Sequence, residues 1–150
     1  MFNNKQGGFN LVQVLLVVAI FLVIASMSVP SLYQFQTGAQ IDTVAAEISQ
    51  NLRRAQSKAI VGYNNSNWGV YFTEDVYTIF SGNDYNTRDA NEDEDYTYSS
   101  AIQLVNDFSD EILFTKITGT PSTAGTITLS TTGNEQAIIT INTLGVIEYR

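Results

Sequence analysis

The chain has no cysteine and no histidine among its 150 residues. The lack of cysteine excludes disulfides, thiol nucleophiles and thiolate zinc sites. The lack of histidine removes the most frequent general base and the imidazole ligand of metal centres. Together the two absences argue against an enzyme, a resident metal and a cofactor, and they favour a structural or binding protein outside the cytoplasm.

Positive charge is also scarce in this chain. Seven Lys and Arg residues stand against fifteen Asp and Glu residues, so the formal net charge is -8. An acidic surface of this kind repels nucleic acid and anionic membranes. Nucleic acid is therefore not expected as a partner, and any partner that is bound through charge should be basic.

What the chain does have is a long apolar run near its N-terminus. Residues 11–29 would form a helix of roughly 28 Å, close to the thickness of the hydrocarbon core of a bilayer. From Val14 to Ala25 the run is apolar on every side, which disfavours the alternative of a buried core helix. Lys5 precedes the run and no basic residue follows it until Arg53, so a single-pass topology with the N-terminus in the cytoplasm is expected.

A short polar leader comes before the apolar run. Gly7 and Gly8 lie on the N-terminal side of the run, whereas a secretory signal peptide has its small-residue cleavage site after the apolar segment. Cleavage after Gly8 would therefore leave the apolar segment on the mature protein. The apolar segment is therefore predicted to function in the mature protein.

The residues GFNLV at positions 8–12, followed by the apolar run and by Pro30, resemble the N-terminal motif of type IV pilins and type II secretion pseudopilins. This resemblance implies that a prepilin peptidase cuts between Gly8 and Phe9, that Phe9 is then methylated, and that Pro30 kinks the helix. It also implies insertion in the inner membrane before assembly. The mature chain would then join other pilin or pseudopilin subunits in a homo- or hetero-polymer, a periplasmic or extracellular filament.

Position 13 departs from the pattern of this family. The family usually has a glutamate there, which is thought to neutralise the N-terminal amine of a neighbouring subunit, and this chain has Gln13. A glutamine accepts a hydrogen bond but brings no charge to an ammonium group in apolar surroundings. Family members without the glutamate are often minor subunits, so Gln13 favours a minor over a major subunit.

The pattern becomes amphipathic after Pro30. Apolar residues recur at intervals of three and four, which predicts that a helix continues over residues 30–62 with one face on a core. These apolar positions are Ile41, Val44, Ile48, Leu52, Ala55 and Ala59. Pro30 and Gly38 weaken the stretch between them, and Gly62 is expected to end the helix.

Two groups of residues fit either a binding site or ordinary structure. Arg53, Arg54 and Lys58 lie near the C-terminal end of the expected helix, where basic side chains interact favourably with the helix dipole. A solvated helix face is therefore preferred to a partner site for these three. Trp68 is the only tryptophan, and a place in the core is preferred to a binding site for it.

After Gly62 the residues favour strands. Aromatic and β-branched clusters, most of them separated by glycine turns, predict seven strands. The strands are expected over residues 68–72, 76–80, 102–105, 112–117, 126–129, 137–141 and 146–149. A helix followed only by strands indicates a pilin-like α+β fold, in which the amphipathic half of a long N-terminal helix packs on an antiparallel β-sheet. The expected organisation is a leader 1–8, a transmembrane half 9–29, an amphipathic half 30–62 and a β-rich head 63–150.

The order of these pieces is similar to that of the GspH/FimT branch of pseudopilins and minor pilins. The likeness rests on residues 52–60, 68–72 and 139–149. Some relatives in this branch bind DNA through a basic C-terminal strand. This chain has Glu148 and a single Arg150 there, so DNA binding is not expected to carry over.

A polar, carboxylate-rich segment over residues 83–95 is predicted to be an exposed loop. A calcium site is the functional alternative, since this hard cation prefers carboxylate and amide oxygens. The alternating candidates are Asp89, Asn91, Asp93 and Asp95. The segment lacks the glycine and the terminal glutamate that an EF-hand loop needs at fixed spacing, so the calcium site is the weaker interpretation.

Three function classes follow from these observations. The leading one is a structural subunit, minor in kind, of a type IV pilus or type II secretion pseudopilus that polymerises through residues 9–29. The second is a binding module on such a fibre, for adhesion or DNA uptake, or an uncleaved membrane-anchored extracytoplasmic domain. The third is an anchored enzyme that uses carboxylates of residues 92–95, which is disfavoured because adjacent carboxylates in a polar loop stay ionised.

Overall fold

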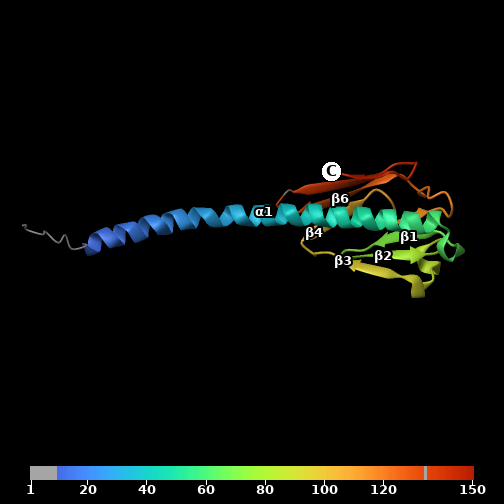
Figure 1. Ribbon diagram of the computed structural model, residues 1–150, viewed down its shortest axis with the longest axis horizontal. Helices are drawn as coiled ribbons and strands as arrows, with labels where there is room; N and C mark the ends of the chain where they lie inside the picture. The colour runs from blue at the N-terminus through green and yellow to red at the C-terminus, as the bar shows by residue number, and fades with distance from the viewer. Residues whose placement is uncertain (1–9, 134) are drawn as a thin grey trace, which may run out of the picture. The chain divides into compact units, whose positions relative to one another are not determined.

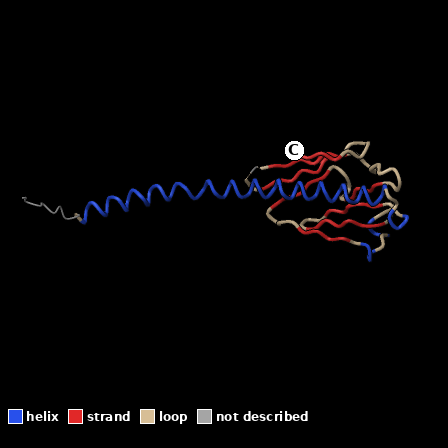
Figure 2. Tube along the Cα trace, viewed as in Figure 1, coloured by secondary structure: helices blue, strands red, loops and turns tan. Residues whose placement is uncertain are grey.

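The computed structural model describes residues 10–133 and 135–150, and over residues 26–39 it describes the backbone but not the side chains. Within these residues one long helix, α1 (Leu11–Ile60), is followed by eight short strands and three single-turn 3-10 helices. The order of the elements can be followed in the ribbon (Figure 1) and in the trace of Figure 2. The chain divides into two compact units, Met1–Gln36 and Thr37–Arg150, and α1 contributes residues to both.

Local signals set both ends of α1. The Asn10 carbonyl accepts hydrogen bonds from the N–H groups of Gln13 at 2.8 Å and Val14 at 3.3 Å, and asparagine is a favoured residue just before a helix. At the other end Gly62 has a φ of +65°, and its N–H donates to the Ala59 carbonyl at 3.0 Å. Glycine adopts this left-handed conformation without strain. The helix ends at Ile60, and the predicted role of Gly62 as the residue that stops it is confirmed.

The stretch between Pro30 and Gly38 is helical in the structure. The sequence predicted a weak point there, because proline removes a backbone donor and glycine has a low helix propensity. Helix formation is cooperative, and long helical segments lie on both sides of this stretch. Two unfavourable residues therefore do not interrupt the helix.

The strands form two antiparallel sheets of four strands each within the described residues. The first sheet has the order β3-β2-β1-β5 and the second has the order β4-β6-β7-β8. The bounds are β1 (Trp68–Phe72), β2 (Val76–Ser81), β3 (Glu94–Thr97), β4 (Ile102–Asn106), β5 (Glu111–Phe114), β6 (Gly125–Thr131), β7 (Gln136–Ile141) and β8 (Ile147–Tyr149). The α+β fold is confirmed, but the single sheet that the sequence predicted is two sheets.

Pairing between distant segments separates the two sheets. β4 does not join the preceding strand β3 but pairs with β6, and β5 returns to pair with β1, where Leu113 lies opposite Gly69. A side chain at position 69 would not fit, because its Cβ atom would lie 2.6 Å from the ring of Phe80. Neighbours in the sequence are often neighbours in a sheet, but three consecutive pairs of strands depart from that tendency: β3 with β4, β4 with β5, and β5 with β6.

The second half of α1, residues 40–60, joins both sheets in one core. Figure 1 shows this part of α1 with β6 on one side and β1, β2 and β3 on the other. The predicted apolar stripe is buried except for Val44, which is partly buried, and Ala45 is an additional buried position. Trp68 is fully buried, and its Nε1–H donates to the Tyr63 carbonyl at 3.0 Å. The core interpretation of Trp68 is therefore confirmed.

Two predictions for the strands are wrong. The strand expected over residues 112–117 ends at Phe114, and Ile117 has a φ of +73°, which an extended strand does not allow. The loop expected over residues 83–95 ends early, because β3 begins at Glu94 and pairs with β2. β3 alternates half-buried and exposed residues, and half of its residues are acidic. A search for apolar alternation misses such a strand.

Candidate functional site

The first half of α1, residues 11–25, has a continuous apolar surface. Twelve large apolar side chains between residues 11 and 24 are 46% to 74% exposed. They are Leu11, Val12, Val14, Leu15, Leu16, Val17, Val18, Ile20, Phe21, Leu22, Val23 and Ile24. Successive residues of a helix point in different directions, so these side chains surround the axis. An exposed apolar surface of this extent marks a contact with a membrane or another protein.

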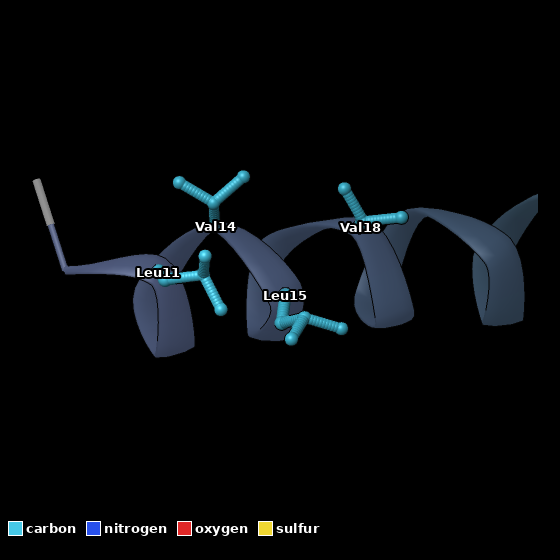
Figure 3. Close-up of a pocket in the computed structure, with 4 residues that line it drawn as sticks. All are labelled: Leu11, Val14, Leu15 and Val18. Carbon is cyan, nitrogen blue, oxygen red and sulfur yellow. The ribbon is translucent and has the colours of Figure 1, made fainter.

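Four of these side chains form a stripe along the helix. Leu11, Val14, Leu15 and Val18 line an open depression on the helix surface. Figure 3 shows Val14 and Val18 pointing to the same side of the helix, with Leu11 and Leu15 on the adjoining side. Spacings of three, four and seven residues place side chains on one helix face. The stripe is therefore a suitable seam for a neighbouring helix.

The predicted processing and assembly residues lie mostly at the limits of the described chain. Gly8 and Phe9 are outside the described residues, and so is the side chain of Pro30. Gln13 lies in the first turn of α1 with its side chain exposed. Over the part of the chain that the structure describes, no helix is long and apolar enough to span a membrane. The membrane segment predicted over residues 9–29 extends beyond the described side chains.

A charged cluster joins the second half of α1 to the edge strand β3. The Glu94 carboxylate forms ion pairs with Lys58 and, at 3.0 Å, with Arg54. It also accepts a hydrogen bond from the Tyr96 hydroxyl at 2.9 Å, and that hydroxyl accepts one from Arg54 at 2.7 Å. The Lys58 ammonium lies 3.9 Å from the ring centroid of Trp68, which is a cation–π contact.

These contacts change the titration of Glu94. Burial by itself would raise the pKa of this carboxyl, but the hydrogen bonds from Lys58 and Tyr96 and the charges of Lys58 and Arg54 have the larger combined effect. The pKa of Glu94 is therefore lowered, and the carboxylate stays ionised. A carboxylate held in this way fastens a helix to a sheet and is a poor general base at neutral pH.

The interpretation of the basic residues as a solvated helix face holds for Arg53 and Arg54, which are exposed, but not for Lys58, which is partly buried, and all three also have partners within the chain. Arg54 and Lys58 bind Glu94, and the Arg53 guanidinium donates to the Ile147 carbonyl of β8 at 2.6 Å. All three side chains therefore connect α1 to the sheets. The sequence did not reveal this because their partners are an unpredicted strand and a backbone carbonyl about ninety positions away along the chain.

The calcium candidates are engaged by protein groups. Asp93 accepts two hydrogen bonds from the Nε of Arg88, at 2.7 and 3.0 Å. Asp95 accepts one from a threonine hydroxyl of β2 at 2.6 Å, and Asp89 accepts bonds from the backbone and side-chain amides of Asn91. No group of three or more His, Cys, Asp and Glu side chains in the described part of the chain is placed to hold a metal ion.

Comparison with known proteins identifies the family. A family model described as "Type II transport protein GspH" matches residues 44–145, which are more than half of the chain. The chain belongs to the GspH family. The matched region holds most of the buried stripe of α1 and all strands up to β7, so the resemblance to the GspH/FimT branch is confirmed. No curated protein matches the chain.

Two solved structures are similar in fold to this GspH-family chain. Both are structures of the minor pseudopilin EpsH from the Type 2 Secretion System of Vibrio cholerae. One has a TM-score of 0.57 and 15% identity, and the match covers 74% of this chain and 96% of that chain. The other has a TM-score of 0.54 and 17% identity, with 75% and 94% covered. At such low identity the likeness establishes the shared pilin-like fold.

Proposed function

We propose that this GspH-family chain is a minor, non-enzymatic subunit of a type II secretion pseudopilus, and that it polymerises through the first half of α1. The observation that carries the proposal is the exposed apolar surface between Leu11 and Ile24. The family match and the EpsH-like fold favour a secretion pseudopilus over a type IV pilus. The ion pairs and hydrogen bonds of residues 93–95 speak against acid–base catalysis there.

In this proposal the apolar helix serves first as a membrane anchor and then as a filament contact. Prepilin peptidase would remove residues 1–8 at the inner membrane, and the new terminus at Phe9 would be methylated. The helix would then leave the lipid and pack against helices of other subunits, with Leu11, Val14 and Val18 among the contacts. Both surroundings are apolar, so the transfer does not expose these side chains to water.

Gln13 supports the assignment as a minor subunit. Its side chain is exposed at the start of the helix, where it can offer an oxygen to a neighbouring N-terminal amine. An amide provides no charge to balance an ammonium group, so repeated contacts of this kind would stabilise a homopolymer poorly. A subunit that occupies few positions among copies of other pseudopilins needs this contact only rarely.

The proposal is tested by intact-mass and N-terminal fragmentation measurements on protein from membranes and from sheared filaments. The expected product begins at Phe9, carries one added methyl group, and occurs in the sheared fraction in few copies relative to the most abundant subunit. A chain that still begins at Met1 and is confined to membranes would contradict the proposal. It would indicate an uncleaved, membrane-anchored extracytoplasmic domain instead.

A further inference from the structure

Three of the four sheet edges in the described part of the chain are protected against pairing with another strand. β5 is covered by Ser122, whose N–H donates to the Leu113 carbonyl at 2.7 Å and whose hydroxyl accepts from the Leu113 N–H at 3.2 Å. At β8 the outward carbonyl of Ile147 is occupied by Arg53. β3 has two acidic side chains among its four residues. Such covers and charges are common ways to prevent pairing at an edge.

β4 has none of these protections. Its sequence, IQLVN, contains no charged residue and no proline, and Val105 is 63% exposed. No described segment lies beyond it in the sheet, where β6 is its single neighbour. An uncharged, partly apolar edge strand is a template for pairing with another polypeptide.

The hydrogen-bond pattern shows which backbone groups of β4 are available. Alternate residues of an antiparallel strand bond to the partner strand, and those between them point the other way. The Asp107 N–H donates to the Thr126 carbonyl at 3.1 Å, which places the N–H and C=O groups of Leu104 and Asn106 on the outer side of β4. Among the described residues, no protein group is hydrogen-bonded to the backbone of Leu104. One donor and one acceptor are therefore free at the middle of the strand.

The free edge opens into a groove. Two adjoining hollows, of about 300 Å³ and 460 Å³, share Leu104 of β4 and Glu74 of the turn between β1 and β2. The buried ring of Phe72 contributes to the apolar lining. The groove thus combines an unpaired strand edge with a mixed lining of apolar and polar side chains, and main-chain pairing together with side-chain contacts is how an added strand is recognised.

The charge along the groove has one sign. Glu74, Asp75 and Asp110 line it, and no Lys or Arg does. Tyr98 lies beside the same turn, and its hydroxyl donates to the Thr73 carbonyl at 2.9 Å. Burial, together with the charges of Asp75 and Glu74, raises the pKa of Tyr98 to about 12. The local potential is negative and favours a cationic ligand.

We propose that β4 is a docking edge for an extended segment of a partner polypeptide that carries both basic and apolar side chains. The segment would add as a further strand, with its backbone paired to Leu104 and Asn106. Its apolar side chains would lie against Leu104 and Val105. Its basic side chains would reach Glu74 and Asp75. This inference concerns the head alone and does not depend on filament assembly.

A second copy of this chain is a poorer occupant than a basic segment. Pairing of β4 with the β4 of another copy would bring two acidic rims together, in a protein of net charge -8. Like charges placed opposite one another at an interface oppose association. A basic segment from a different polypeptide gains from the same charges.

The test uses the full chain in detergent and three short peptides. The first alternates lysine with valine, the second alternates glutamate with valine, and the third is the lysine peptide with methyl groups on alternate backbone nitrogens. Binding is measured by fluorescence anisotropy at low salt, and the site is located by amide hydrogen exchange. The lysine peptide should bind about tenfold or more tightly than the glutamate peptide. It should also slow the exchange of the Leu104 N–H.

Matched variants separate the groove from the general charge of the protein. The double variant Glu74→Gln with Asp75→Asn should weaken binding of the lysine peptide about tenfold. The double variant Asp42→Asn with Glu148→Gln, which also removes two exposed charges, should leave binding unchanged. Equal effects of the two double variants would overturn the proposal.

Three further outcomes would overturn it in different ways. Equal binding of the backbone-methylated peptide would mean adsorption by charge without strand pairing. Protection of β3 instead of β4 would place the site elsewhere. Protection of Leu104 that grows with protein concentration in the absence of peptide would identify a second copy as the occupant.

Discussion

The two halves of α1 share one backbone geometry but differ in where their apolar side chains are buried. Over residues 11–25 the large apolar side chains surround the axis and are exposed in the single chain. Over residues 40–60 they form one stripe, and its members from Ile41 to Ala59 are buried almost completely except for Val44, which is partly buried. The comparison teaches that a stripe is buried by the chain's own sheets, whereas a uniformly apolar helix needs surroundings from outside the chain.

The polar face of the second half adds to this contrast. The amide of Gln56 donates to the carbonyls of Gly119 at 3.0 Å and Gly145 at 2.8 Å, which ties two loops to the helix. Gly145 has a φ of +81°, and a Cβ atom there would lie 2.4 Å from the Gln56 amide nitrogen. The polar residues of this half therefore hold the head together, while the first half has few polar residues to use in this way.

The largest expected effect is a difference between the two halves of α1 in how much a substitution lowers the free energy of unfolding. Leu52→Ala removes a fully buried side chain and should lower the free energy of unfolding of the head by about 2–5 kcal/mol. Leu15→Ala removes a side chain that is 61% exposed and should change that free energy by no more than about 0.5 kcal/mol. Urea unfolding followed by the fluorescence of Trp68, the only tryptophan, measures both. Equal losses in the two variants would break the comparison.

The next effect separates the halves by assembly. Val18→Lys places a charge on the apolar surface and should disfavour insertion in a membrane by about 3 kcal/mol. The protein should then be lost from the membrane and filament fractions, with the unfolding of the head unchanged. Val18→Leu keeps the surface apolar and is the matched control. Normal recovery of the lysine variant in filaments would show that the first half of α1 does not require apolar surroundings.

A smaller effect concerns a buried polar contact of the second half. The hydroxyl of Tyr77 accepts a hydrogen bond from the amide of Asn51 at 2.7 Å and donates to Glu47 at 3.4 Å. Tyr77→Phe should lower the free energy of unfolding by about 1 kcal/mol, because the buried amide loses its acceptor. Tyr149→Phe, at an exposed position, should have no measurable effect in the same urea titration. A neutral result at position 77 would mean that water replaces the hydroxyl.

Burial raises the pKa of Tyr77, and this sharpens the same prediction at alkaline pH. An acid that is held neutral in the folded state stabilises that state most below its unfolded pKa, and the contribution is lost as the pH rises toward the folded pKa. The native protein should therefore lose stability above about pH 10. Tyr77→Phe should lose less over that range.

The smallest effect concerns Glu94 and acid pH. Its folded pKa is lowered from the ordinary value of 4.5, so its contribution to stability is present above that value and is lost as the pH falls through the folded pKa. Glu94→Gln should cost about 0.5 kcal/mol at pH 7, because Arg54 is half exposed. As the pH is lowered below 4.5, the midpoint temperature of thermal unfolding should fall less steeply in this variant than in the native protein. Parallel pH curves would contradict the role of the cluster, and Glu148→Gln is the control for loss of an exposed carboxylate.

Particular residues show how far sequence patterns reach in this protein. The end of α1 just before Gly62, the buried stripe around Leu52 and the core position of Trp68 were all predictable, because each depends on local conformation or on burial of an apolar group. Ile117 was assigned to a strand because it is β-branched, yet the turn that contains it and the hydrogen bond from its N–H to Ala59 override that preference. Propensity is a weak guide where tertiary contacts choose the backbone conformation.

The charged residues were the hardest to interpret. From the sequence, Glu94 and Asp95 were assigned to a solvated loop. In the structure they belong to β3, which is identified as a strand by its antiparallel pairing with β2. The open edge at Leu104 was equally hidden, because residues 102–105 were predicted as a strand without any indication of the order of strands. A strand lies at the edge of a sheet when no other segment pairs with one of its two sides. The residues of the strand itself do not encode this.

By itself, the sequence determined the long helix, the change from an apolar to an amphipathic surface along it, the positions of most strands and the membership of the pilin-like class. These features depend on interactions between residues close together in the chain and on the hydrophobic period. Only the tertiary structure decided that there are two sheets, that the basic residues of α1 bind β3 and β8, and that β4 is left open. Those choices are set by contacts between residues far apart in the chain, and their free energies arise only when the two sheets and the helix pack together.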